Sequence, residues 1–365
     1  MTNRPEGALA PRQAASSLAP QSSFNVVWLQ AGSCGGCTLA ALGTDDRGLE
    51  AVLAPFGIRF VYHPALNTES GPEALERLNH LLDGEIPIDA LCIEGSAMTG
   101  PNGTGRFQWI SGLNRSMASL IRDLAGRARY TVAVGTCASF GGLPVAGVEP
   151  GEALGLQYLD KNKTDGLLKS TYRSAAGLPV INIAGCAPHP GWLNETLIAL
   201  ASGTVTEADL DSLGRPRFYA DHLAHHGCNR NEFYEFKASA EFLSQKGCMM
   251  EHLGCKATQS AGDCNQRTWN GGPACASSGY PCIACTEPGF ERSDLPYQET
   301  PKVAGIPVGL PLDMPRAWFV ALAALSKSAT PKRVRANALA DHVVVPPAKR
   351  EAVADSPSKQ VKGRS

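Results

Sequence analysis

The residues best suited to chemistry in this chain are its cysteines, because eleven of the twelve fall into three groups. With one histidine they give twelve candidate metal ligands, arranged as three sets of four. The sets are Cys34, Cys37, Cys137 and Cys186; His225, Cys228, Cys248 and Cys255; and Cys264, Cys275, Cys282 and Cys285. Four thiolates, or three with an imidazole, can hold a cubane iron–sulfur cluster. The sequence therefore predicts three iron–sulfur clusters, an arrangement suited to moving electrons over a distance.

Zinc is the main alternative metal for these ligands. Structural zinc sites usually take their ligands as two close pairs, whereas Cys137 and Cys186 come singly from distant parts of the chain. A thioredoxin-like role for the CxxC of Cys34 and Cys37 is disfavoured, since two more cysteines are expected beside it. The spacing favours iron–sulfur clusters, and zinc stays open for the second set, whose three cysteines and one histidine also suit it.

Strand and helix patterns alternate in the first half of the chain. Five short apolar runs, rich in Val and Ile, have the near-continuous hydrophobicity of strands buried on both faces. They are residues 24–30, 58–64, 88–95, 130–138 and 178–185, and helical patterns lie between them at 71–84, 113–128 and 190–203. This alternation predicts an α/β fold, a flavodoxin-like or Rossmann-type doubly wound parallel sheet of five strands.

Such a sheet brings the first cysteine set together. Cys34 and Cys37 follow the first predicted strand, Cys137 ends the fourth, and Cys186 follows the fifth. The carboxyl ends of parallel strands share one edge, which is where open α/β sheets bind ligands. Glycines beside these cysteines let the backbone pass close to a bulky cluster.

The second half has a different composition. Residues 221–291 hold seven cysteines among Gly, Asn, Ser and Pro, with too few aliphatic side chains for a core of their own. We therefore expect a flavodoxin-like domain at 24–203 and a small loop-rich iron–sulfur domain at 204–300, whose clusters contribute its folding energy. A disordered N-terminal arm at 1–23 and a C-terminal extension at 301–365 are expected to flank them.

Other features narrow the function. The net charge of −1 gives no attraction to nucleic acid. With clustered cysteines and no recognisable leader, a cytoplasmic chain is expected, and peripheral membrane association is left open. The apolar stretch 317–325 is about half of the ~20 residues that span a membrane, so a docking or core helix is expected there. Cys92, inside an apolar strand, is expected to be a buried free thiol. Since no nucleophile elbow or nucleotide fingerprint is found, no catalytic residue is predicted.

In their order along the chain, these motifs resemble the small subunit of nickel–iron hydrogenases, from residue 24 to about 295. The motifs are the CxxC at 34–37, IEGS at 93–96, GTCAS at 135–139, GCAPHP at 185–190, HxxC at 225–228, LGCK at 253–256 and PCIACTEPGF at 281–290. The resemblance implies an electron-relay subunit that takes part in reversible H2 oxidation only with a large subunit, which holds a nickel–iron centre. It assigns the first set to a proximal cluster, the third to a medial cluster and the second to a distal cluster. It also implies an acceptor protein or quinone system and a higher oligomer of the heterodimer as partners.

The chain departs from that family in three respects. Cys275 stands where many members have proline, which predicts a four-iron medial cluster instead of a three-iron one, so that all three clusters are 4Fe–4S. Asp45 and Asp46 follow the first CxxC, so a carboxylate is a candidate to replace one proximal thiolate. No twin-arginine leader or C-terminal membrane anchor is recognised. Together these features most resemble the actinobacterial, high-affinity uptake hydrogenases.

Two other functions stay open on the sequence. An electron-relay subunit of a complex I-like quinone or cofactor oxidoreductase would share the first cysteine set, but such relatives generally lack the region from His225 to Cys285. A zinc-stapled binding scaffold would have the same ligands and no redox role.

Overall fold

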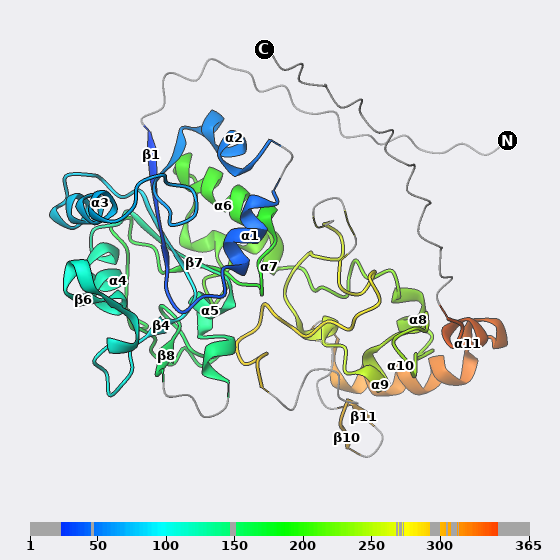
Figure 1. Ribbon diagram of the computed structural model, residues 1–365. Helices are drawn as coiled ribbons and strands as arrows, with labels where there is room; N and C mark the ends of the chain where they lie inside the picture. Colours follow the sequence, from blue (N-terminus) through cyan, green and yellow to red (C-terminus); the bar gives the residue numbers. More distant parts are fainter. Residues whose placement is uncertain are drawn as a thin grey trace, which may run out of the picture.

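A parallel sheet of five strands lies at the centre of the first half of the chain (Figure 1). The computed structural model describes residues 23–44, 47–146, 151–267, 269, 272, 274–292, 300–303, 306–307, 312 and 314–341. The strands are β1 (Phe24–Gln30), β2 (Ile58–Tyr62), β3 (Ala90–Glu94), β7 (Tyr130–Val134) and β9 (Ile181–Ile183). Their order is β2-β1-β3-β7-β9, and every neighbouring pair is parallel. This is the flavodoxin-like order, so the predicted fold class is confirmed.

Helices cover both faces of the sheet because successive side chains of a strand point to opposite faces. In β1, Val26 and Trp28 belong to the core on one face, and Val27 and Leu29 to the core on the other. Helices α1 (Gly36–Leu42), α2 (Leu49–Leu53) and α6 (Pro190–Ala201) pack on the first face, and α3 (Pro72–Asp83) and α4 (Met117–Ala125) on the second. Three layers result, with the sheet in the middle (Figure 1).

One predicted strand ends earlier than expected. Strand β7 ends at Val134, and helix α5 (Thr136–Phe140) follows at once. Cys137 therefore lies in the first turn of a helix and not at the end of a strand. Gly135 makes the turn with a φ of 89°, a conformation that favours glycine. The apolar run 130–138 predicted a single strand because the first turn of α5 is also buried.

Short elements complete the first half. They are the strand pairs β4 (Ala97–Met98) with β8 (Ala153–Leu154) and β5 (Trp109–Ile110) with β6 (Arg115–Ser116), and the 3-10 helices η1 (Ala54–Phe56), η2 (Arg106–Gln108), η3 (Ser111–Leu113), η4 (Leu143–Val145) and η5 (Glu207–Asp209). Helix α7 (Arg217–Ala220) packs against the sheet domain, where Tyr219 stacks on Trp192 at 4.2 Å between ring centroids.

The second half is mostly loops with short helices. Its elements are α8 (Asn231–Glu235), α9 (Met250–Leu253), η6 (Ala257–Gln259), β10 (Lys302–Val303), β11 (Ile306–Pro307), α10 (Arg316–Ala329) and α11 (Lys332–Ala338). Small apolar clusters support them, such as Tyr234 with Met250 and Phe319. The apolar stretch 317–325 lies within α10, and no helix in the described ranges is long and apolar enough to cross a membrane.

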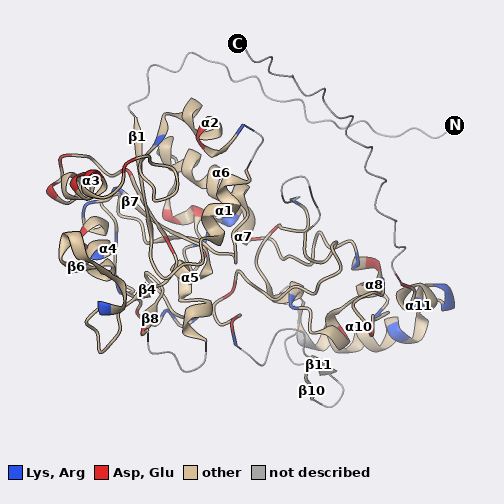
Figure 2. Cartoon of the chain, viewed as in Figure 1, with Lys and Arg blue, Asp and Glu red and all other residues tan. Residues whose placement is uncertain are grey.

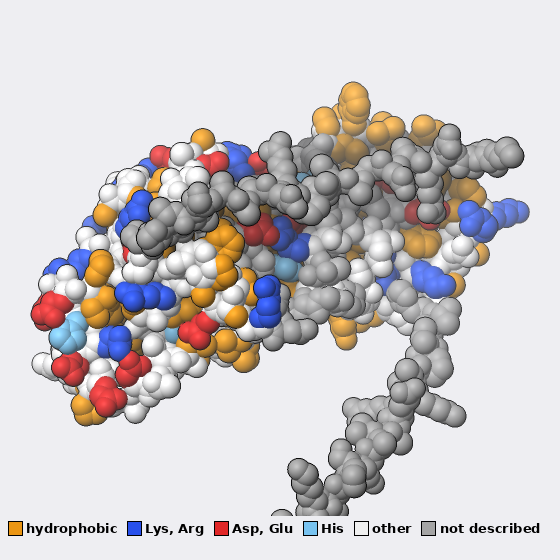
Figure 3. All heavy atoms as spheres, turned by 90° about the horizontal axis from the view of Figure 1, so that it is seen from above, with side chains coloured by type: hydrophobic (Ala, Val, Ile, Leu, Met, Phe, Trp, Pro, Cys, Tyr) orange, Lys and Arg blue, Asp and Glu red, His pale blue; other side chains and the backbone are white. Residues whose placement is uncertain are grey.

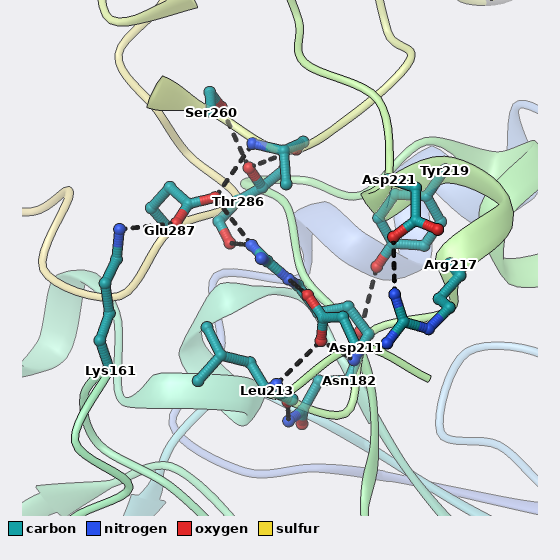
Figure 4. Close-up of polar contacts among 12 residues, drawn as sticks. Lys161, Asn182, Asp211, Leu213, Arg217, Tyr219, Asp221, Ser260, Thr286 and Glu287 are labelled. Atoms are coloured by element: carbon teal, nitrogen blue, oxygen red, sulfur yellow. Dashed lines mark hydrogen bonds and ion pairs between the residues drawn. The ribbon is translucent and has the colours of Figure 1, made fainter. Parts of the chain in front are cut away.

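A buried ion-pair network joins the two halves (Figure 4). The guanidinium of Arg215 lies 2.8 Å from Asp211, whose neighbour Leu210 packs in the core of the sheet domain, and 2.7 Å from Glu287 in the iron–sulfur half. Glu287 also accepts a hydrogen bond from the Ala261 N–H and pairs with Lys161 at 3.1 Å. Because Glu287 follows the last cysteine motif closely, the network fixes that loop against the sheet domain.

Burial and charge act against each other in this network. Burial alone would lower the pKa of Arg215, but Glu287 and Asp211 outweigh it and raise the pKa. Burial likewise favours a neutral Glu287, and Arg215 and the Ala261 N–H overcome this and hold its pKa below the ordinary value. Arg215 and Glu287 are therefore both charged near neutral pH.

We predict that Arg215→Met lowers the free energy of unfolding by about 3–5 kcal/mol. The change removes the cation shared by the buried Glu287 and the partly buried Asp211, and it leaves Glu287 paired with the exposed Lys161 alone. Urea unfolding of the intact protein measures this. The matched control is Arg173→Met, which removes an exposed pair with Glu207 and is expected to cost less than about 1 kcal/mol. Equal losses in the two variants would contradict the role given to Arg215.

Candidate metal centres

The first cysteine set lies at the carboxyl edge of the sheet, as predicted. Strands β1, β3, β7 and β9 end there in register, through the pairs Gln30 with Glu94, Glu94 with Val134 and Val134 with Ile183. Cys34 and Cys37 lie at the start of α1, Cys137 in the first turn of α5, and Cys186 between β9 and α6. Burial raises the pKa of Cys37, and so do the charges of Glu94, Cys137, Cys186 and Cys34. The structure thus brings these four thiols together.

Two glycines leave room for the thiols. A Cβ atom on Gly135 would lie 2.5 Å from the Cys37 Sγ, and one on Gly142 would lie 2.8 Å from the Cys137 Sγ. Both distances are far below van der Waals contact. Any larger residue would push a thiol out of place, which agrees with the need for close backbone approach around a cluster.

Glu94 is the residue that sequence reasoning missed at this edge. Its carboxylate is fully buried at the end of β3. It accepts hydrogen bonds from Trp28 Nε1, Gln30 Nε2, Ser33 Oγ, the N–H groups of Cys37 and Thr38, and Thr38 Oγ1. The carboxylate therefore ties the CxxC loop to the sheet. The available signal for Glu94 was a charged residue at the end of an apolar strand. In the sequence, Glu94 was recognised only as part of the IEGS motif and was given no role.

The hydrogen bonds decide the charge of Glu94. Burial alone would raise its pKa, but the bonds from Thr38, Gln30 and Ser33 outweigh that effect and hold the pKa below the ordinary value. A carboxylate that accepts several hydrogen bonds behaves in this way. Glu94 is thus a fixed negative charge beside Cys37, and it disfavours further negative charge on that thiol.

The second set lines one small cavity that opens to solvent. His225, Cys228, Cys248 and Cys255 all contribute to its wall, together with Arg230, Tyr234, Met249 and Met250. His225 is largely buried, with its ring edge-on to Tyr234 at 4.5 Å between centroids. Burial raises the pKa of Cys248 to about 12. A cavity walled by three thiols and an imidazole fits a metal cluster.

The third set lies in the loop region after residue 263. Burial raises the pKa of Cys264 to about 11, and the charge of Cys275 adds to the rise. The pKa of Cys285 is raised to about 12, again chiefly by burial, and the charges of Cys264 and Cys275 add to the rise. Cys282 is raised well above its ordinary pKa by burial and by the charges of Cys255 and Cys285. All four thiols of the set therefore lie close to one another.

The third set also touches the other two. The backbone carbonyl of Cys285 accepts a hydrogen bond from the hydroxyl of Thr136, the neighbour of Cys137 in the first set, and the charge of Cys186 raises the pKa of Cys285. The backbone N–H of Cys282 donates to the Cys255 Sγ of the second set at 3.3 Å. The three sets thus form a continuous series, with the third in the middle.

Backbone N–H groups surround the sulfurs. Arg230 and Ala284 each donate at 3.4 Å, to the thiols of Cys228 and Cys282. Hydrogen bonds of this kind to cluster sulfurs are one of the ways in which proteins set a reduction potential. Within the described residues, no group of three or more His, Cys, Asp or Glu is arranged to hold a single metal ion.

Two predicted features lie outside the three sets. Cys92 is fully buried in β3, as predicted for a free thiol with a packing role. Asp45 and Asp46, the candidate carboxylate ligands of the first set, lie outside the described residues.

We predict that Glu94→Gln lowers the free energy of unfolding by about 2–3 kcal/mol at pH 7, because a charged acceptor for six donors is lost. Because the pKa of Glu94 is lower in the folded protein than in the unfolded chain, its ionisation stabilises the fold at pH values above the ordinary carboxyl pKa. This stabilisation is lost as the pH falls through the folded-state pKa. The difference from the unmodified protein should therefore shrink below about pH 4. Urea unfolding at pH 7 and below about pH 4 measures this difference. The control is Glu76→Gln, on the exposed side of α3. A loss that does not change with pH would contradict the ionised state of Glu94.

Two family models match the chain, in separate parts. Residues 34–200 match the 20 kDa subunit of NADH ubiquinone oxidoreductase, and residues 220–298 match the C-terminal region of nickel–iron and nickel–iron–selenium hydrogenase small subunits. The first match agrees with the cysteine set that complex I-like subunits were expected to share. The second covers the region that those relatives were expected to lack.

Whole-chain relatives carry hydrogenase names. The small subunit of the F420 non-reducing hydrogenase II of Methanosarcina mazei is 31% identical over 82% of this chain and 82% of its own length. The periplasmic nickel–iron–selenium hydrogenase small subunit of Desulfomicrobium baculatum is 30% identical over 74% of this chain and 86% of its own.

Solved structures agree. The actinobacterial-type nickel–iron hydrogenase of Ralstonia eutropha H16 has a TM-score of 0.68 at 25% identity and covers 84% of this chain and 90% of its own. The reduced nickel–iron–selenium hydrogenase of Desulfomicrobium baculatum has a TM-score of 0.63 at 27% identity, over 76% of this chain and 100% of its own. These relatives agree with the strand order and the three cysteine sets described above. This chain belongs to the family of nickel–iron hydrogenase small subunits.

Proposed function

We propose that this chain relays electrons from H2 oxidation in a large subunit through three 4Fe–4S clusters to an external acceptor, as part of an uptake hydrogenase. Small subunits of this family pair with a large subunit that holds the nickel–iron centre. The first cysteine set would hold the proximal cluster, the third the medial cluster and the second the distal cluster. When bound, such clusters accept and release single electrons.

One observation carries this proposal: the third set lies between the other two and touches both. Cys285 contacts Thr136, which adjoins Cys137 of the first set, at one end, and Cys282 contacts Cys255 of the second set at the other. A zinc scaffold needs no such continuity between separate sites, whereas electron transfer requires its carriers to follow one another closely.

The first set also lies where a large partner could cover it. Cys34 and Cys186 are exposed at the sheet edge. Leu39 and Leu143, each close to a cysteine of this set in sequence, are exposed to 70% and 53%. Exposed apolar side chains around partly exposed thiols are typical of a protein interface that becomes buried on assembly. We infer that this edge is the face toward the large subunit.

The buried thiols should require metal to lose their protons. The pKa of Cys137 and that of Cys264 are both raised to about 11 by burial and neighbouring charge. Thiolate is the form that ligates metal, so cluster binding releases these protons and contributes to folding of the second half.

We predict about twelve irons and about twelve acid-labile sulfides per chain in the anaerobically purified complex, the content of three 4Fe–4S clusters. Metal analysis and sulfide assay measure this content. About three zincs without sulfide would instead support the binding scaffold. About four irons would support a single proximal cluster, as in a complex I-like subunit.

We predict that Cys275→Pro leaves the medial site with three thiolates and converts it to a three-iron cluster of higher potential, because an anionic ligand is lost. EPR of the oxidised complex should show a new three-iron signal while the signals of the other two clusters stay unchanged. Cys92→Ala is the matched control, since its thiol lies in the sheet core and should change no cluster signal. A Cys275→Pro spectrum without the new signal would remove Cys275 from the ligand set.

A further inference from the structure

Helix α10 presents an apolar face that no described part of the chain covers. Trp318 and Leu325, seven residues apart and hence on one side of the helix, are 66% and 65% exposed. Leu322 lies between them and is also exposed. The adjacent side packs inward through Phe319, which is 4% exposed. The outward side of α10 is therefore apolar, although nothing in its packing onto the domain requires that.

Basic residues lie at one end of this face. Residues 317–326 contain no charged side chain, whereas Lys327, Lys332, Arg333 and Arg335 follow within the next turns. Figure 2 shows the same distribution, with α10 tan over most of its length and blue at its far end and on α11. Helix α11 is held by buried Val334 and Ala338, so its basic residues point outward.

The net charge of residues 312–341 is opposite in sign to that of the whole chain. Residues 312–341 contain five Lys or Arg and two Asp, while the whole chain has a net charge of −1. In Figure 3 a group of hydrophobic side chains projects from one edge of the half that carries α10, and Lys and Arg lie at the far end of that half. A helix with Trp and Leu on one side and Lys and Arg beside it is the pattern that lies in the interface of an anionic bilayer.

We propose that the outer face of α10, with the basic end formed by α11, docks on an anionic lipid surface. Trp318, Leu322 and Leu325 would enter the boundary between headgroups and acyl chains, where tryptophan is favoured. Lys332 and Arg335 would face lipid phosphates. The helix lies in the plane of the surface and does not cross it, which agrees with its length.

The docking surface lies directly over the second cysteine set. Phe319 on the inner side of α10 packs with Tyr234, and Tyr234 contacts the ring of His225 at 4.5 Å. Cys248 and Cys255 adjoin the same apolar cluster. Only the thickness of one helix, ~10 Å, thus separates the candidate distal site from the lipid-facing side. On the proposed function, a lipid-soluble acceptor would approach the relay here.

The test is cosedimentation of the purified complex with vesicles of phosphatidylcholine alone or mixed with phosphatidylglycerol. Binding is expected only with the anionic vesicles, and it should weaken at high salt. The double variant Trp318→Ser with Leu325→Ser should weaken binding roughly tenfold or more. The double variant Lys332→Glu with Arg335→Glu should weaken it by roughly fivefold or more for each residue.

Two control variants match these changes on the sheet domain. Phe56→Ser alters an apolar side chain that is 40% exposed, at the end of η1 just before β2 and away from the cysteines. Arg122→Glu reverses an exposed charge near the end of α4. Both controls should bind vesicles like the unmodified complex, and all variants should reduce a soluble dye with H2 at the unmodified rate.

Three results would overturn the docking proposal. The unmodified complex could fail to bind anionic vesicles, or the α10 and α11 variants could bind as well as the controls. The apolar variant could instead split an oligomer in solution without any lipid binding, which would assign the face to a second copy of this chain. Iron content and dye reduction are measured separately, so failure of the electron-relay function would be distinguished from failure of lipid docking.

Discussion

The structure depends on one electrostatic constraint, the confinement of many thiols in a small buried space. Burial raises the pKa of most of these thiols, and the charge of each raises the pKa of its neighbours. Without metal, the low-energy state of such a group is a set of protonated thiols. Metal cations reverse this preference, because they stabilise the thiolates that repel one another. The same crowding that opposes ionisation in the empty chain therefore makes cluster binding a source of folding energy.

The two halves of the chain meet that constraint in different ways. The sheet domain has two large apolar cores, and its strands fix the first set in register regardless of metal. Glu94 reinforces this by bonding the CxxC loop to β3. In the described part of the second half, the apolar clusters are small. The Arg215 network fixes this half to the sheet domain, and the proposed iron–sulfur clusters would supply much of the remaining folding energy. We therefore expect the first set to be preorganised and the other two to form as metal binds.

The sequence predicted those features that depend on local patterns. Val- and Ile-rich runs predicted the strands, and the rule that places ligands at the carboxyl ends of parallel strands predicted where the first cysteine set converges. Cysteine spacing predicted which thiols belong together, and the structure brings them together as expected, while their role as ligands stays a prediction. Cys137 was placed on a strand because the first turn of α5 is as buried as the strand before it. Burial alone cannot distinguish a short strand from a helical turn.

The missed features depend on contacts between distant residues. Glu94 looks like any acidic residue at the end of a strand until its donors converge from β1 and α1. Arg215 and Glu287 are 72 positions apart, and no local signal pairs them. Both carboxylates keep their charge only because the fold supplies partners that outweigh the cost of burial. A sequence pattern can locate a charged residue in an apolar context, but the identity of its partners follows only from the topology that brings them within reach.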